Sequence, residues 1–364
     1  MIDRQTYLKP LASLQFFAVV VVVLVHLWTK DLLFFGNACV SFCFAYSGYF
    51  TARHHRFDGT YGMKDHLRFM WSKLAKIYPL HVLALVICIL SAYRMGHIDS
   101  LNFKMLAAHL TLTSPWFPYQ SYYFGYNTVA WFICVLFFLY LVAPVVVRFW
   151  RRLPLAWQPV LLALLLAVEF VGGYTTDGGN QGLFLNSYHL CQFPPIRLLE
   201  FSAGIIIFNF SQSAWWREHQ SRLTPRRATF IEVGAIVLTA LLHPLCKNYL
   251  NTYCFRAFCA SFPMVITMLG VFLFTNGQGG AVSRALSVKP LTCLSTLDAE
   301  IYLLQLGLYF ALLPAFESCG ITQYPILHFT MQFSSLIFIS WLVHRYYTRP
   351  IARLLTASLP GKGK

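Results

Sequence analysis

The sequence predicts an all-α membrane protein, and its composition is the first reason. Of 364 residues, 57% are hydrophobic and only 11% are charged. Soluble domains carry roughly 25% charged residues, which is enough polar surface to cover a globule in water. Because this chain has too little, we expect one integral membrane domain over residues 1–364 and no separate soluble domain.

Long apolar runs are the second reason. A helix needs about 20 apolar residues to cross the hydrocarbon core of a bilayer. Several runs reach this length, and ten are predicted to span the membrane: 11–29, 33–52, 72–93, 128–147, 155–172, 195–210, 228–243, 255–275, 290–313 and 325–344. An eleventh run, 104–114, is shorter, and we expect it to be a re-entrant or interfacial part of a long external loop.

The basic residues are the third reason, and they also orient the chain. With ten spans and a cytoplasmic N-terminus, most of the 28 lysines and arginines fall in cytoplasmic segments. Both termini are therefore predicted to be cytoplasmic. The net charge of +15 could suggest nucleic acid, but no soluble basic domain is there to present it. We expect no nucleic-acid partner and assign the charge to topology and to anionic lipid headgroups.

The first predicted helix carries two polar side chains on one face. Gln15 and His26 are eleven residues apart, which places them within about 20° of each other around the helix and about 16 Å apart along it. Polar groups at membrane depth are costly and often mark functional sites. From this stretch alone, His26 is either an interfacial residue beside Trp28 or a functional one.

The second predicted helix has a face of small residues, Ala38, Ser41, Ala45 and Gly48, at helical spacing. Such a face lets a neighbouring helix approach closely. Packing explains most of this pattern, although Asn37, Ser41 and Ser47 could still line a cavity.

Two lysines lie at the start of the third predicted helix. Lys73 and Lys76 are three residues apart and therefore on one side of the cytoplasmic turn. They either extend to the interface or bind the phosphates of a cytosolic donor, with Arg53 and Arg56 adding positive charge nearby.

Carboxylates occur in the sixth and ninth predicted helices. Arg197 and Glu200, spaced i, i+3, can neutralise each other. In the ninth helix, a polar stripe contains Ser295, Asp298, Tyr302 and Gln305. Glu300 points away from this stripe. A carboxylate on such a stripe is hard to explain by packing alone.

The predicted external loops, 114–131 and 175–195, mix aromatic rings with amides and hydroxyls. This mixture suits either a sugar, whose flat face stacks on rings, or an interfacial aromatic belt. Ten cysteines show no C-x-x-C pair, so we expect no metal site. Cys246 and Cys254 could form a disulfide in a short external loop.

Taken together, these pieces resemble acyltransferase family 3, the membrane O-acyltransferases of cell-envelope glycans. The matching pieces, in chain order, are His26 at the end of the first apolar run and the stretches "CVSFCFAYSGYF", "KLAKIYP", "AWFICVLFFLYLVAP" and "RLLEFSAGI". The chain also departs from the family pattern. Gln15 stands where arginine is common, Lys73 and Lys76 where arginines are usual, Leu136 where glutamate is frequent, and Gln305 where histidine is usual.

The resemblance implies transfer of an acyl group, with acetyl expected, from cytosolic acyl-CoA to a hydroxyl of an envelope glycan or lipid-linked glycan, in a bacterial inner membrane. His26 would act as the general base, a role that suits an imidazole. Ser47, Tyr302 or Gln305 would stabilise the oxyanion, and Asp298 or Glu200 would orient the imidazole. The donor would contact Lys73, Lys76, Arg53, Arg56 and Gln15. The acceptor would contact Trp116, Tyr122, Tyr123, Trp131, Arg197 and Gln305.

Two alternatives remain at this point. The residues missing from the family pattern would also fit a non-enzymatic transporter of a glycan or lipid-linked glycan, or a degenerate member that serves as a partner or sensor. Transporters often show broken helices and inverted repeats, and we find neither in the sequence.

Overall fold

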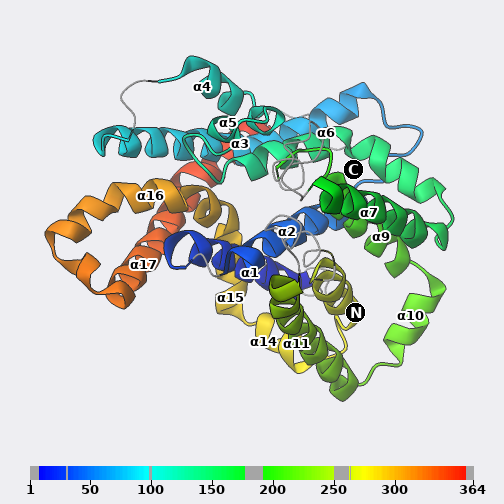
Figure 1. The fold of residues 1–364 in the computed structure, drawn as a ribbon. Helices are drawn as coiled ribbons and strands as arrows, with labels where there is room; N and C mark the ends of the chain where they lie inside the picture. The colour runs from blue at the N-terminus through cyan, green and yellow to red at the C-terminus, as the bar shows by residue number, and fades with distance from the viewer. Residues whose placement is uncertain are drawn as a thin grey trace. The chain divides into compact units, whose positions relative to one another are not determined.

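The computed structural model describes residues 8–29, 32–97, 101–176, 192–249, 262 and 264–357. Within these ranges the chain is helical and contains no strand (Figure 1). The predicted all-α class is therefore confirmed. The candidate disulfide between Cys246 and Cys254 lies outside the described residues.

Most helices match the predicted apolar runs. The longer ones are α1 (Lys9–Leu27), α2 (Leu33–His54), α3 (Met63–Arg94), α6 (Trp131–Arg152), α7 (Trp157–Thr176), α9 (Leu198–Ser211), α11 (Pro225–Tyr249), α16 (Asp298–Ser318) and α17 (Pro325–Val343). The shorter ones are α4 (Phe103–Leu110), α5 (Gln120–Tyr123), α10 (Ala214–Ser221), α13 (Val271–Phe274), α14 (Ala281–Leu286), α15 (Lys289–Leu294) and α18 (Arg349–Ala357), with a π-helical turn at Ile266–Gly270 and another at His344–Thr348.

Helix α3 begins nine residues before the predicted apolar run. The Asp65 carboxylate accepts a hydrogen bond from the backbone N–H of Gly62 at 3.0 Å, which caps a polar first turn. A hydropathy pattern identifies only the apolar part of such a helix, so the polar first turns of α3 were not predicted.

Five helical stretches among the described residues are long and apolar enough to cross a membrane: Lys9–Leu27, Met63–Arg94, Trp131–Arg152, Lys289–Ser318 and Pro325–Ala357. The chain is therefore compatible with an integral membrane protein, while the ten spans and the cytoplasmic termini stay predictions. Helix α4 has only eight residues, or about 12 Å, and is too short to cross.

The chain forms two compact units, each built from segments distant in the sequence. Unit 1 comprises the described parts of Met1–Val25, Lys30–Asp58 and Val142–Thr296. Its closest helix pair is α2 against α9, where glycines allow the backbones to touch. A Cβ placed on Gly204 would lie 1.8 Å from the carbonyl oxygen of Ala45, and one on Gly48 would lie 2.0 Å from that of Phe201. The predicted packing role of the small-residue face is confirmed.

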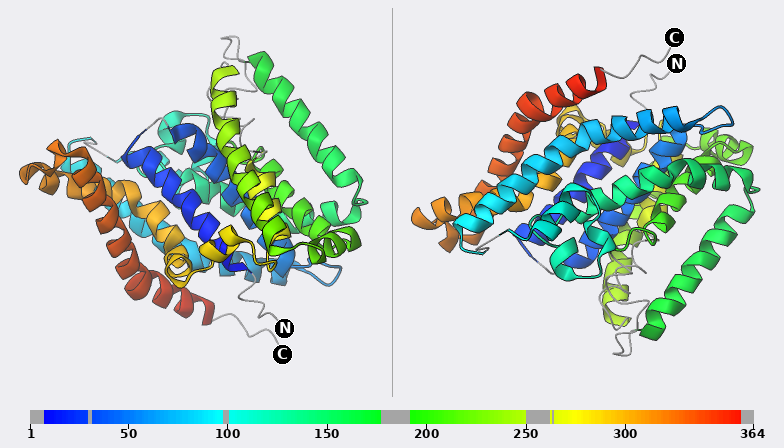
Figure 2. Two further views of the ribbon diagram at one scale, coloured as in Figure 1. Left: turned by 90° about the horizontal axis from the view of Figure 1, so that it is seen from below. Right: turned by 90° about the horizontal axis from the view of Figure 1, so that it is seen from above.

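Unit 2 comprises the described parts of His26–Thr29, Gly59–Leu141 and Leu297–Lys364. Helix α3 packs against α16, where Ser91 Oγ donates a hydrogen bond to the carbonyl oxygen of Gly307 at 3.3 Å. Helix α17 packs against α16, and α18 lies along α3, as the red and cyan helices in Figure 2 show.

Candidate active site

The site in unit 2 is built around His26, in the last turn of α1. Its Nδ1 atom lies 3.0 Å from Oε1 of Gln305, a residue 279 positions away in the third turn of α16. The Gln305 side chain is fully buried, whereas His26 is exposed. A buried amide therefore holds an imidazole whose remaining surface is accessible.

The orientation of the Gln305 amide determines where the imidazole carries its proton. Gln305 Nε2 donates to the carbonyl oxygen of Tyr302 at 2.8 Å, which leaves Oε1 to face His26. A carbonyl oxygen can only accept, so Nδ1 of His26 must be the donor. In a neutral imidazole the other nitrogen, Nε2, then holds a lone pair and can accept a proton.

Neighbouring contacts fix this part of α16. The Tyr302 ring packs against Phe132 with 5.1 Å between centroids. The side-chain amide of Asn127, fully buried, donates to the carbonyl oxygen of Leu303 at 3.0 Å. The turn that carries Gln305 is therefore held from two sides.

The hydrogen-bond partner of the His26 imidazole is Gln305. The orienting role expected of Asp298 or Glu200 stays a prediction. Asp298 is the first residue of α16 and lies about 10 Å from Gln305 along the helix, two turns away. Glu200 belongs to unit 1. Glu300 points away from this site, as predicted, and accepts a hydrogen bond from Nδ1 of His344 at 3.0 Å.

A buried polar cluster in unit 1 contains Arg197, Glu200 and Ser41. Arg197 is 3% exposed and Glu200 is 0% exposed, and their side chains form an ion pair through Nη1 and Oε1. Ser41 Oγ donates to the same carboxylate oxygen at 3.0 Å and accepts from Arg197 at 3.2 Å. The predicted neutralisation of Glu200 by Arg197 is confirmed. Arg197, expected to contact an acceptor, is buried in this cluster.

The remaining candidate in α2 is Ser47. Its hydroxyl donates to the carbonyl oxygen of Cys43, one turn earlier on the same helix, at 2.9 Å. This local bond uses the proton that an oxyanion would need.

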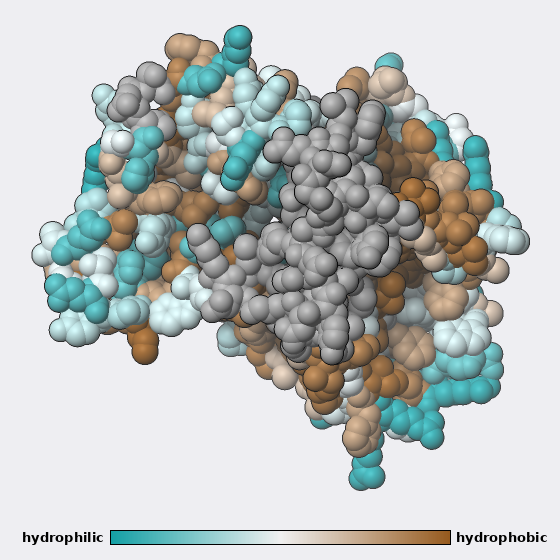
Figure 3. All heavy atoms as spheres, in the orientation of Figure 1, coloured by the Kyte–Doolittle hydropathy of each residue, from teal (hydrophilic) through white to brown (hydrophobic). Residues whose placement is uncertain are grey.

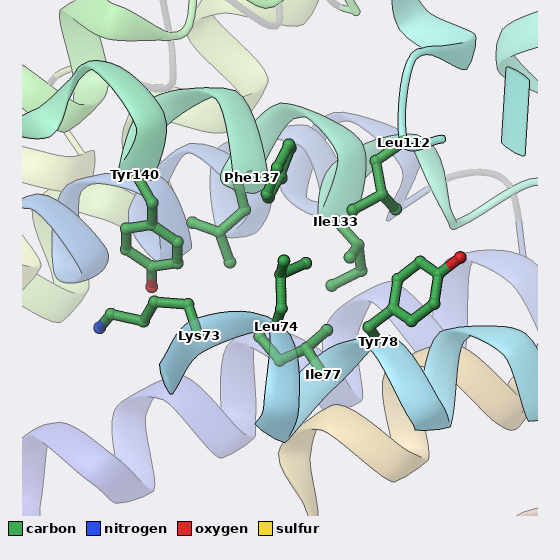
Figure 4. A pocket seen from close by; sticks show the side chains of 9 residues that line it. Lys73, Leu74, Ile77, Tyr78, Leu112, Ile133, Phe137 and Tyr140 are labelled. Carbon is green, nitrogen blue, oxygen red and sulfur yellow. The ribbon is translucent and has the colours of Figure 1, made fainter. Parts of the chain in front are cut away.

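Lys73 lines a mostly apolar pocket in unit 2, between α3 and α6 (Figure 4). Its ammonium nitrogen lies 4.4 Å from the ring centroid of Tyr140 and 5.3 Å from that of Phe69. Such cation–π contacts hold a cation without a carboxylate partner. The amino group is therefore placed at one end of the pocket, where it can meet an anionic ligand.

The other cations expected to bind a donor lie differently. Lys76 is exposed on α3, one turn from Lys73. Arg53, in unit 1, donates to the hydroxyl of Tyr49 at 3.4 Å, and the carbonyl oxygen of exposed Arg56 accepts from Arg151. Gln15 is half-buried in α1.

The aromatic segment 114–131 folds in unit 2 as short helical turns. Trp116 is 41% exposed, and Tyr122 and Tyr123 are half-buried, so these rings remain partly accessible. Trp131 is 6% exposed and is not available to stack on a sugar. The second aromatic loop falls almost entirely outside the described residues.

Behind this segment lies a buried histidine pair. His81 Nε2 donates to the carbonyl oxygen of His109 at 3.0 Å, and both side chains are fully buried. Burial, with a smaller contribution from His81, lowers the pKa of His109 from 6.5 to about 4. His109, in the short helix α4, is therefore neutral at physiological pH.

Sequence reasoning missed Tyr140 and Phe69 as partners of Lys73, and Ser41 as a partner of Glu200. The available signal for the aromatic pair was the position of Lys73, the second residue of the predicted apolar run 72–93, where apolar side chains surround a cation. Ser41 was expected to pack against a neighbouring helix or to line a cavity, but not to bond with Glu200.

Comparison with known proteins finds a similarity to a protein named acyltransferase MdmB from Streptomyces mycarofaciens. The two are 29% identical over 220 residues, which cover 57% of this chain and 54% of that protein. The chain thus spans about half the length of the curated relative that it matches. No protein-family model and no solved structure matches. The similarity supports an acyltransferase in general terms.

Proposed function

We propose that this protein is a membrane acyltransferase in which His26 activates a hydroxyl group. The observation that carries the proposal is the hydrogen bond from His26 Nδ1 to the buried amide of Gln305. It leaves Nε2 free to accept a proton on an exposed imidazole. The similarity to a protein named acyltransferase supports the same reaction class.

The reaction is the attack of an alcohol on a thioester. His26 Nε2 takes the hydroxyl proton as the oxygen attacks the acyl carbon, and the tetrahedral oxyanion then expels the thiolate, which receives that proton. Tyr302, in the turn next to the Gln305 amide, stays our candidate donor to the oxyanion.

For the donor we propose acyl-CoA, with acetyl as the acyl group. Lys73 would meet its phosphates at one end of the apolar pocket. Ser91 of α3 contacts α16 at Gly307, two residues from Gln305. Lys73 lies 18 residues before Ser91 on α3, so Lys73 and the Gln305 region are roughly 25 Å apart along this helix. A donor bound at both needs a long flexible arm between its phosphates and its thioester, which CoA has.

For the acceptor we propose a hydroxyl of a cell-envelope glycan or lipid-linked glycan at a bacterial inner membrane. The accessible rings of Trp116, Tyr122 and Tyr123 offer flat faces for a sugar. These side chains belong to the same unit as His26.

The proposed function is tested by deleting the gene and restoring it with wild-type protein or with His26→Ala. Membranes are supplied with radiolabelled acetyl-CoA, and the envelope glycan is analysed for label and for a mass increase of one acetyl group. Wild type is expected to restore both signals and His26→Ala neither. Equal labelling at equal protein level would refute the role of His26, and glycan movement without labelling would favour a transporter.

A further inference from the structure

Unit 1 contains an apolar groove that the proposed reaction does not use. It has a volume of about 520 Å³ and is lined by α7, α9, α10, the π-helical turn Ile266–Gly270 and α13. Helix α9 forms its back, packing against α7 on one side and against the π-helical turn on the other. Not one of the residues that line it is charged.

One end of the groove is closed by aromatic rings. Trp216 packs edge-on against Phe274 with 4.9 Å between centroids, and Phe210 contacts both Trp215 and Trp216. Gln220 ties α10 to this end by donating to the carbonyl oxygens of Leu273 and Phe274 at 3.2 and 2.9 Å. Tryptophans at the end of an apolar surface are typical of the membrane interface.

Two exposed arginines lie close in sequence to residues that line the groove. Arg217 directly follows Trp216, and Arg152 lies three residues before Leu155, the first lining residue. Both arginines are exposed, and neither contributes to the groove itself. Figure 3 shows the same change from apolar to polar surface, with hydrophobic surface over α7 and α9 and hydrophilic surface over α10.

We propose that this groove binds one anionic phospholipid, with an acyl chain between α7 and α9 and the phosphate at Arg152 and Arg217. The apolar lining fits a hydrocarbon chain, and the two arginines complement a negative headgroup. The aromatic end of the groove sets the depth at which the lipid's acyl chain ends and its headgroup begins.

The test is native mass spectrometry of the full-length protein in detergent, titrated with phosphatidylglycerol or phosphatidylcholine. Wild type is expected to bind one phosphatidylglycerol saturably and about tenfold more tightly than phosphatidylcholine. Arg152→Ala combined with Arg217→Ala is expected to remove this preference. Equal binding of the two lipids by wild type would overturn the proposal.

A matched pair of substitutions tests the acyl-chain position. Ala163 lines the groove, whereas its neighbour Leu164 is 60% exposed and does not. Ala163→Trp is expected to weaken phosphatidylglycerol binding by at least about tenfold, because it displaces several buried methylenes, while Leu164→Trp leaves it unchanged. Gly270→Leu is a second blocking variant, since a Cβ there has open space.

Two outcomes would overturn the proposed position of the acyl chain in the groove. Either both blocking variants, folded as judged by circular dichroism, bind lipid as wild type does, or the wild type is a dimer that they convert to a monomer. The second outcome would identify the occupant as another copy of the chain.

Discussion

Replacing Gln305 by leucine tests how the candidate base is held. The substitution removes the acceptor for the Nδ1 proton of His26 and places an apolar side chain in a fully buried position. The proton is then free to occupy Nε2, where it blocks the nitrogen that must accept a proton from the substrate.

Gln305→Leu removes two hydrogen bonds, one to His26 and one to the carbonyl oxygen of Tyr302 within α16. The effect on the imidazole follows from the first. Such a bond contributes about 0.5–1.5 kcal/mol, and about 1.36 kcal/mol corresponds to a factor of ten in rate. We therefore expect kcat/KM for acyl transfer to fall roughly 2- to 13-fold. The KM for the donor should not change, because its proposed phosphate contact at Lys73 lies far along α3.

The assay is transfer of radiolabelled acetyl by purified protein, normalised to folded protein and measured across pH. Gln305→Glu keeps an acceptor and adds a negative charge that stabilises the imidazolium, so the acid limb of its pH–rate profile should move to higher pH. Ser91→Ala is the control, since it removes a different hydrogen bond to α16. The reasoning is refuted if Gln305→Leu is as active as wild type, or if Ser91→Ala loses as much activity.

Three further predictions concern stability, measured as the unfolding midpoint in detergent. Gly204→Ala should destabilise by about 1–3 kcal/mol, because its Cβ would lie 1.8 Å from a backbone oxygen of α2; Gly234→Ala, with open space at its Cβ, should not, and equal midpoints would contradict this. Arg197→Met should cost about 3–5 kcal/mol by leaving the Glu200 carboxylate buried without its cation, and adding Glu200→Leu should recover most of it; a double variant as unstable as the single one would argue against this account. Because the pKa of His109 is about 4 when folded and 6.5 in an unfolded chain, the unfolded chain binds more protons between these values. The contribution of His109 to stability should therefore fall by up to about 3 kcal/mol as pH falls from 6.5 to 4. The loss of stability over this range should be smaller in His109→Leu, and an unchanged loss would contradict this.

The helices and their local chemistry could be predicted because they depend on residues close in sequence. The small-residue face of α2 follows from a spacing of three and four residues, and it does pack against a neighbouring helix. The pairing of Arg197 with Glu200 likewise follows from their i, i+3 spacing.

The assembled site could not be predicted, because it joins residues distant in sequence. Gln305 was expected to contact the oxyanion or the acceptor, whereas its contact with His26 depends on where two helices meet. The contact of the Lys73 amino group with the Tyr140 ring depends in the same way on where α6 meets α3. Periodicity determines which face of a helix is polar, but not which other helix that face meets.

The most direct test of the proposed acyl transfer is the rate of acetyl transfer by purified His26→Ala, with and without added imidazole. If His26 Nε2 removes the hydroxyl proton, the rate should fall by about 10²- to 10⁴-fold relative to wild type, and imidazole in solution should restore part of it. A folded His26→Ala protein that retains more than about a tenth of the wild-type rate would contradict the role of His26 as general base.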